Sequence, residues 1–121
     1  MAIPLLICDD SNMARRQLQS SLPDGWEVDI TFATSGADGL EAIRQGRGDL
    51  VFLDLTMPDM SGYDVLEVIK EEGLKCMVIV VSGDIQPAAL ERAKTLGALD
   101  FIKKPLSSDR LLEVLQKYGL L

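Results

Sequence analysis

"VFLDLTMPD", residues 51–59, is the stretch that decides the fold of this chain. A run that reads as a buried strand leads directly to Asp54, and Pro58 follows four residues later. Nearly continuous apolar strands are typical of parallel sheets that are covered by helices on both faces. The carboxylate of Asp54 is therefore expected at the end of an interior strand, and its role depends on what lies beside it.

Apolar runs elsewhere in the chain indicate the other strands. The second run alternates apolar residues with acidic or polar ones, which fits a half-exposed edge strand. The first, third and fourth are nearly continuous in apolar residues, as expected for strands buried on both faces. In order, the five runs span residues 4–8, 27–33, 49–55, 76–82 and 99–104.

Amphipathic segments with helical spacing lie between and after these runs. A serine stands near the expected start of four of these helices, where it can act as an N-cap. These serines are Ser11, Ser35, Ser61 and Ser107. Five β–α repeats predict one domain over residues 1–121: an α/β fold of three layers, a doubly wound five-stranded parallel sheet with five helices.

Composition narrows the classes of function. The chain has 121 residues, a net charge of −7 and no histidine, which removes the usual general base and zinc ligand. The acidic balance argues against nucleic-acid binding. No apolar stretch approaches the roughly 20 residues of a membrane span, so we expect a cytoplasmic protein. Cys8 and Cys76 lie in apolar runs and read as small core residues rather than a redox pair.

Candidate site residues follow four of the five predicted strands, whereas the second is followed only by Thr34 and Ser35. Asp9 and Asp10 follow the first, Asp54 closes the third, Ser82 the fourth and Lys104 the fifth. Parallel strands end at the same edge of their sheet, where ligands bind in doubly wound folds. Each residue alone has a structural explanation, as a cap, a turn residue or a surface lysine. Together they predict a site with three carboxylates, a hydroxyl and an ammonium group.

The chemistry of this group points to phosphoryl transfer. Crowded carboxylates repel unless a cation joins them, and oxygen ligands without His or Cys suit Mg²⁺. Asp54 can then act as a nucleophile toward a phosphoryl donor. Lys104 would neutralise phosphate oxygens, and Ser82 would donate a hydrogen bond to one.

Four motifs resemble the receiver domain of two-component response regulators, and the resemblance covers essentially the whole chain. The motifs are "ICDDSNMAR", "FLDLTMPDMSGYDVL", "VVSGD" and "DFIKKPL", in this order along the chain. The resemblance implies a flavodoxin-like sheet with strand order 2-1-3-4-5. It also implies a histidine kinase or phosphotransfer protein as phosphoryl donor, and a partner, output domain or dimer mate on the face of the fourth helix, fifth strand and fifth helix.

The resemblance also implies a role for each motif position. Asp54 would be the phosphoacceptor; Lys104 and Ser82 would contact the phosphoryl group, and Phe101 would be the aromatic that moves with Ser82. The implied Mg²⁺ ligands are Asp9, Asp10, Asp54 and the main-chain carbonyl of Thr56. Pro58 and Gly62 would shape the loop, with a cis bond before Pro105. Thr56 and Asp84 would flank the path of the hydrolytic water.

Two other functions compete with a phosphorylation switch, which is not a turnover enzyme. Phosphatases of the haloacid dehalogenase type also use an aspartate nucleophile with Mg²⁺. They carry a second Asp two residues later, where this chain has Thr56, and their nucleophile usually follows the first strand. A receiver that acts only as an interaction module is the third reading, and the complete acidic set, Ser82 and Lys104 argue against it.

Overall fold

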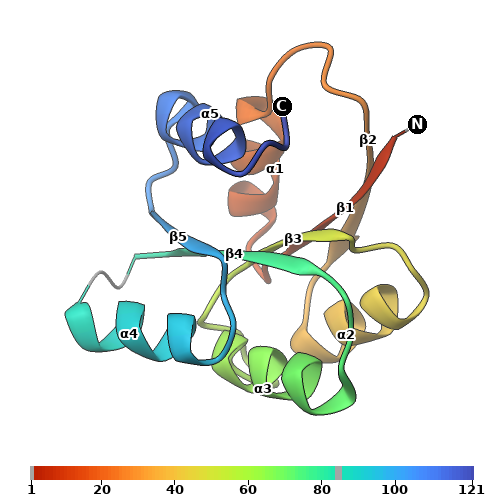
Figure 1. The fold of residues 1–121 in the computed structure, drawn as a ribbon, viewed down its shortest axis with the longest axis vertical. Coiled ribbons are helices and arrows are strands. Elements are labelled where there is room, and N and C mark those ends of the chain that lie inside the picture. The colour runs from red at the N-terminus through yellow and green to blue at the C-terminus, as the bar shows by residue number, and fades with distance from the viewer. Residues whose placement is uncertain (1, 84–85) are drawn as a thin grey trace.

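Strands and helices alternate strictly along the computed structural model, which describes residues 2–83 and 86–121 (Figure 1). The strands are β1 (Ile3–Cys8), β2 (Val28–Ala33), β3 (Leu50–Leu53), β4 (Met77–Ser82) and β5 (Asp100–Lys103). The helices are α1 (Asn12–Ser21), α2 (Gly36–Arg44), α3 (Gly62–Glu72), α4 (Pro87–Thr95) and α5 (Ser108–Lys117). The predicted succession of five β–α units is confirmed.

The sheet is parallel throughout, with the order β2-β1-β3-β4-β5. This order confirms the expectation, and it makes β2 an edge strand. β2 is only partly buried, and Phe32 at its carboxyl end is 45% exposed. β3, by contrast, is buried at every position, as its continuous apolar run predicts.

Two apolar cores lie on the two faces of the sheet. Helices α1 and α5 cover one face and α2, α3 and α4 cover the other, which gives three layers (Figure 1). Side chains of β1 alternate between them: Leu5 and Ile7 pack toward α1 and α5, whereas Leu6 and Cys8 pack toward the opposite layer. The central strands thus serve both cores, which explains their continuous apolar sequence.

The serine caps are confirmed at all four predicted positions. The side chains of Ser11, Ser35, Ser61 and Ser107 each accept a hydrogen bond from the backbone N–H three residues later. α1 is therefore capped by Ser11, which leaves the side chain of Asp10 for another role. These caps stabilise a helix by about 1 kcal/mol each.

Cys8 and Cys76 are both free thiols, as predicted. Cys8 is buried, but Cys76 is only partly buried and precedes β4 by one residue, so its assignment to the core was too strong. In residues 2–83 and 86–121, no helix is both long enough and apolar enough to cross a membrane.

Candidate functional site

Backbone pairing carries the predicted site residues to one edge of the sheet. The N–H of Asp54 donates to the carbonyl oxygen of Cys8 at 3.0 Å, which extends the β1–β3 ladder by one residue. The N–H of Lys104 donates to the carbonyl oxygen of Ser82 at 2.8 Å and does the same for β4 and β5. The sheet itself therefore places these residues side by side.

Three carboxylates meet at this edge. Asp9, Asp10 and Asp54 each offer an oxygen atom, and the three oxygens lie within 4.8 Å of one another. Asp9 and Asp54 are buried, whereas Asp10 is exposed. The cluster thus has a buried base and an open side from which a cation or a phosphoryl donor can approach.

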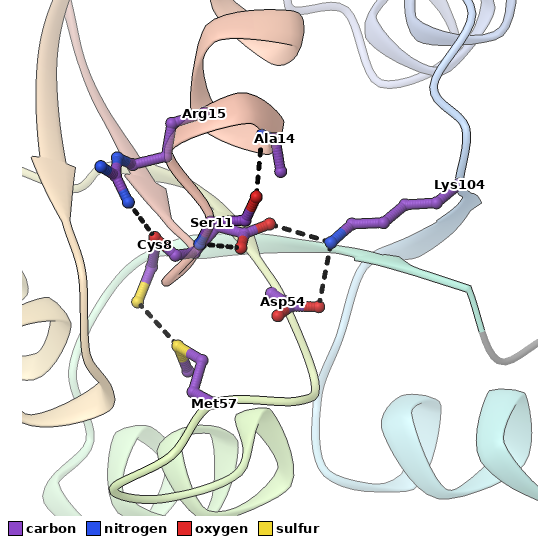
Figure 2. Close-up of polar contacts among 8 residues, drawn as sticks. Cys8, Ser11, Ala14, Arg15, Asp54, Met57 and Lys104 are labelled. Atoms are coloured by element: carbon purple, nitrogen blue, oxygen red, sulfur yellow. Dashed lines mark hydrogen bonds and ion pairs between the residues drawn. The ribbon is translucent and has the colours of Figure 1, made fainter.

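Lys104 contacts both buried carboxylates. Its Nζ atom lies 3.0 Å from Asp9 Oδ2 and 3.3 Å from Asp54 Oδ1 (Figure 2). Burial lowers the pKa of Lys104, but the hydrogen bond to Asp9 and the charges of Asp54 and Asp9 together raise it. The ammonium group is therefore charged at neutral pH. It connects the end of β5 to the ends of β1 and β3, neither of which is adjacent to β5 in the sheet.

Asp54 is held in an environment that disfavours its charge. Burial, followed by repulsion from Asp9, raises the pKa of Asp54 above its ordinary value, although Lys104 counteracts both effects. A carboxylate in this position gains from any interaction that spreads or balances its charge, such as a cation or a covalent bond to phosphorus.

Asp9 has three partners besides Ala33, whose carbonyl oxygen accepts the Asp9 N–H at 3.0 Å. Its Oδ1 accepts the N–H of Ser11 at 2.9 Å, and its Oδ2 contacts Lys104. The guanidinium of Arg15 donates from Nη1 to the main-chain carbonyl of Asp9 at 2.8 Å. Arg15 was not among the predicted site residues, because an arginine at the fourth position of a helix reads as a surface residue.

The loop after Asp54 packs closely against the start of α3. The N–H of Gly62 donates to the carbonyl oxygen of Leu55 at 2.9 Å. A Cβ atom at Gly62 would lie 2.5 Å from the carbonyl oxygen of Asp54 and 2.8 Å from Cα of Leu55. Glycine is thus required here by close backbone approach, and Pro58 lies exposed in the same loop.

The remaining predicted residues lie around this group. Ser82 is 3% exposed at the end of β4, and Phe101, one residue beyond the start of β5, is partly buried against the core that faces α2, α3 and α4. Thr56 is exposed in the loop, and the bond between Lys104 and Pro105 is cis, as the resemblance implies. Asp84 lies outside the described residues.

Comparisons with known proteins assign this arrangement to a family. The protein-family model of the response regulator receiver domain matches residues 5–116. The chain is a response regulator receiver domain. Receivers are signalling switches rather than turnover enzymes, and they bind Mg²⁺ at an acidic pocket.

Individual relatives differ in length. The chemotaxis protein CheY of Bacillus subtilis is 36% identical over 118 residues, which cover 97% of this chain and 98% of CheY. The transcriptional regulatory protein DltR of Streptococcus agalactiae is 38% identical over 109 residues, which cover 89% of this chain but 48% of DltR. This receiver therefore resembles both a single-domain protein and part of a longer one.

The fold agrees with solved receivers. The REC domain of AraT, a response regulator from Geobacillus stearothermophilus, superposes with a TM-score of 0.83 at 31% identity. The match covers 97% of this chain and 92% of that one. Family membership and the position of Asp54 after β3 remove the haloacid dehalogenase alternative.

Proposed function

We propose that this receiver is a phosphoacceptor switch in which Asp54 accepts a phosphoryl group. One observation carries the proposal: the ammonium of Lys104 contacts Asp54 at 3.3 Å beside two further carboxylates, in a chain of the receiver family. A degenerate receiver that serves only as an interaction module has no need of this group. The complete set favours chemistry at Asp54.

The reaction needs one nucleophile and one group that stabilises phosphate charge. A carboxylate oxygen of Asp54 forms a bond to phosphorus, while the bond between phosphorus and the donor atom breaks and the leaving group keeps its electron pair. Lys104 is placed to hold a phosphoryl oxygen, since it already lies against Asp54. The hydroxyl of Ser82 closes β4 at the same edge and is the candidate donor to a second oxygen.

The donor set fits Mg²⁺ in its chemistry. Asp9, Asp10 and Asp54 supply only oxygen atoms, and the main-chain carbonyl of Thr56 is the proposed fourth ligand. A bound Mg²⁺ would supply positive charge that offsets the phosphate and the carboxylates. Asp10, the exposed member of the three, can turn toward the ion without breaking a described contact of the fold.

The phosphoryl donor in this proposal is a histidine kinase or a phosphotransfer protein. The output partner, whether an attached domain, a target protein or a second copy of the chain, binds the face formed by α4, β5 and α5. Phe101 and Lys103 of β5 belong to this face, whereas Ala88, Arg92 and Thr95 of α4 line a groove with Glu67 of α3. Leu112 of α5 is 38% exposed, but it lines a groove with Ser21 and Leu22 at the end of α1.

The switch links this face to the phosphoryl group. Ser82 moves toward a phosphate oxygen, and a charge-assisted hydrogen bond of this kind contributes about 1.5–3 kcal/mol. Its movement frees space into which the partly buried ring of Phe101 turns. The change biases an equilibrium between two existing conformations rather than creating a new fold.

Incubation with acetyl phosphate tests the proposed function. With Mg²⁺ present, intact mass spectrometry should show one added phosphoryl group, and hydroxylamine should remove it, since the bond is an acyl phosphate. A chelator of divalent cations should prevent the reaction. A chain that stays unmodified with Mg²⁺ and several phosphoryl donors would contradict the proposal.

A further inference from the structure

One carboxylate from the β3–α3 loop binds the amino end of α2. The N–H of Gly36 donates to Asp59 Oδ1 at 3.0 Å, and the N–H of Ala37 donates to Asp59 Oδ2 at 3.0 Å. The first N–H groups of a helix have no partner within the helix, and an anion is favoured there. These two bonds, that to Gly36 first, lower the pKa of Asp59.

Packing joins the same two segments. A Cβ atom at Gly36 would collide with the side chain of Met60, so the loop and the first residue of α2 are in direct contact. Below them, Cys8 Sγ lies 3.4 Å from the carbonyl oxygen of Ser35 and 3.7 Å from Met57 Sδ. The end of β1, the start of α2 and the loop thus meet around Asp59.

The loop held in this way carries the proposed metal ligands. Asp54 stands at its beginning, and Thr56, whose carbonyl is the proposed ligand, lies three residues before Asp59. Thr56 and Pro58 are exposed, so their side chains do not anchor this part of the loop in the core. Asp59 therefore adds two directed hydrogen bonds to the packing of Met57, which is buried, and Met60, which is partly buried.

We propose that Asp59 is a positioning residue for the cation and phosphoryl site. By binding the N–H groups of Gly36 and Ala37, it holds the β3–α3 loop against α2 and thereby sets the place of the Thr56 carbonyl and the Asp54 backbone. Asp59 itself touches no reacting group. The inference rests on the proposed function, because it concerns the same site.

The test is Mg²⁺ binding by the full chain without any phosphoryl donor, measured by calorimetry. Asp59→Ala should weaken Mg²⁺ binding about tenfold, the lower end of the effect of removing a residue that orients metal ligands. Asp59→Asn keeps one acceptor oxygen and should fall between wild type and Asp59→Ala. Amide hydrogen exchange at Gly36 and Ala37 should accelerate in Asp59→Ala even without metal.

Two control variants separate positioning from other effects. Asp38→Asn removes an exposed charge from the same helix end, and Ser107→Ala removes the N-cap of α5 on the opposite face of the sheet. Both should change Mg²⁺ affinity less than about twofold. Salt screens the exposed charge of Asp38, and Ser107 caps a helix that packs on the other face of the sheet. If Asp59→Ala weakens Mg²⁺ binding no more than Asp38→Asn does, the positioning role is wrong. If Asp59→Ala fails to fold, the comparison of Asp59→Asn with Asp38→Asn decides the same point.

The same titrations separate this inference from the proposed function. Wild type that binds no Mg²⁺ would overturn the proposed function as well. If wild type binds Mg²⁺, the affinities of the variants test the role of Asp59 alone.

Discussion

The Nζ atom of Lys104 lies 3.3 Å from Asp54 Oδ1, although 50 residues separate them in the chain. The same atom contacts Asp9 Oδ2 at 3.0 Å. A single ammonium group thus offsets part of the repulsion between two buried carboxylates, and it lies where a phosphoryl group on Asp54 would be neutralised. Lys104 therefore contributes both to the stability of the unmodified protein and to the chemistry proposed for Asp54.

Lys104→Ala separates these two contributions. Without the ammonium, Asp9 and Asp54 repel each other and attract a cation more strongly, so Mg²⁺ affinity should rise by about threefold to tenfold, or up to about 1.4 kcal/mol. Phosphorylation by acetyl phosphate should nevertheless become slower, because no cation from the protein meets the phosphate oxygens. Calorimetry and intact mass spectrometry measure the two effects, and weaker Mg²⁺ binding by this variant would contradict the assignment.

Asp54→Asn should stabilise the fold at neutral pH by roughly 1 kcal/mol, a typical size for one substitution. The pKa of Asp54 is raised, so its favourable contribution is present below the ordinary value of 3.8 and is lost as pH rises through the raised value. The amide resembles the protonated carboxyl and avoids this loss. Urea unfolding followed by Trp26 fluorescence should show the gain at pH 7 and little difference near pH 3.5.

A gain that stays the same from pH 7 to pH 3.5 would contradict the raised pKa. Trp26 suits the measurement, since its indole N–H donates to the carbonyl oxygen of Leu120 at 3.0 Å and reports contact between distant parts of the chain.

Gly62→Ala should destabilise the protein by about 1–3 kcal/mol, as overpacking of a close contact does. Its Cβ would press on the Asp54 carbonyl at 2.5 Å, so phosphorylation should slow as well. Gly83→Ala is the matched control, because a Cβ there meets no atom of residues 2–83 and 86–121 within 4 Å, apart from its chain neighbours. Equal stability of the two variants in urea unfolding would show that the start of α3 does not press on the backbone of Asp54.

Ser82→Ala should keep phosphorylation largely intact and blunt the response of the α4-β5-α5 face. Amide chemical shifts of wild type and variant, with and without beryllofluoride as a phosphoryl mimic, measure this response. Phe101→Ala should have a similar effect by removing the ring that moves. Shift changes on this face that are as large in Ser82→Ala as in wild type would show that the signal leaves by another path.

The fold and the central site were predictable because the parallel topology of the sheet fixes where the residue that follows each strand lies. Asp9, Asp54 and Lys104 each follow an apolar run, and a parallel sheet brings all such ends to one edge. The starts of α1, α2, α3 and α5 were predictable from serines, since an N-cap acts on its own helix.

Contacts between separate helices, strands and loops leave no such pattern in the sequence. Asp59 caps a helix that begins 23 residues earlier in the chain, and its sequence neighbours mark it only as a turn residue. The carboxylate of Asp100 on β5 likewise meets Tyr118 at 3.0 Å and Arg110 at 3.6 Å through the packing of α5. Such partners depend on how helices lie against the sheet, which spacing along one element does not specify.

The most direct test of the account is the location of the phosphoryl group. After reaction with acetyl phosphate and Mg²⁺, wild type should carry one hydroxylamine-labile phosphoryl group, and Asp54→Asn should carry none, because an amide is a poor nucleophile. Asp64→Asn, which changes an exposed carboxylate of α3 outside the site, should be labelled like wild type. A label of wild-type extent and lability in Asp54→Asn would place the acceptor elsewhere and contradict the account.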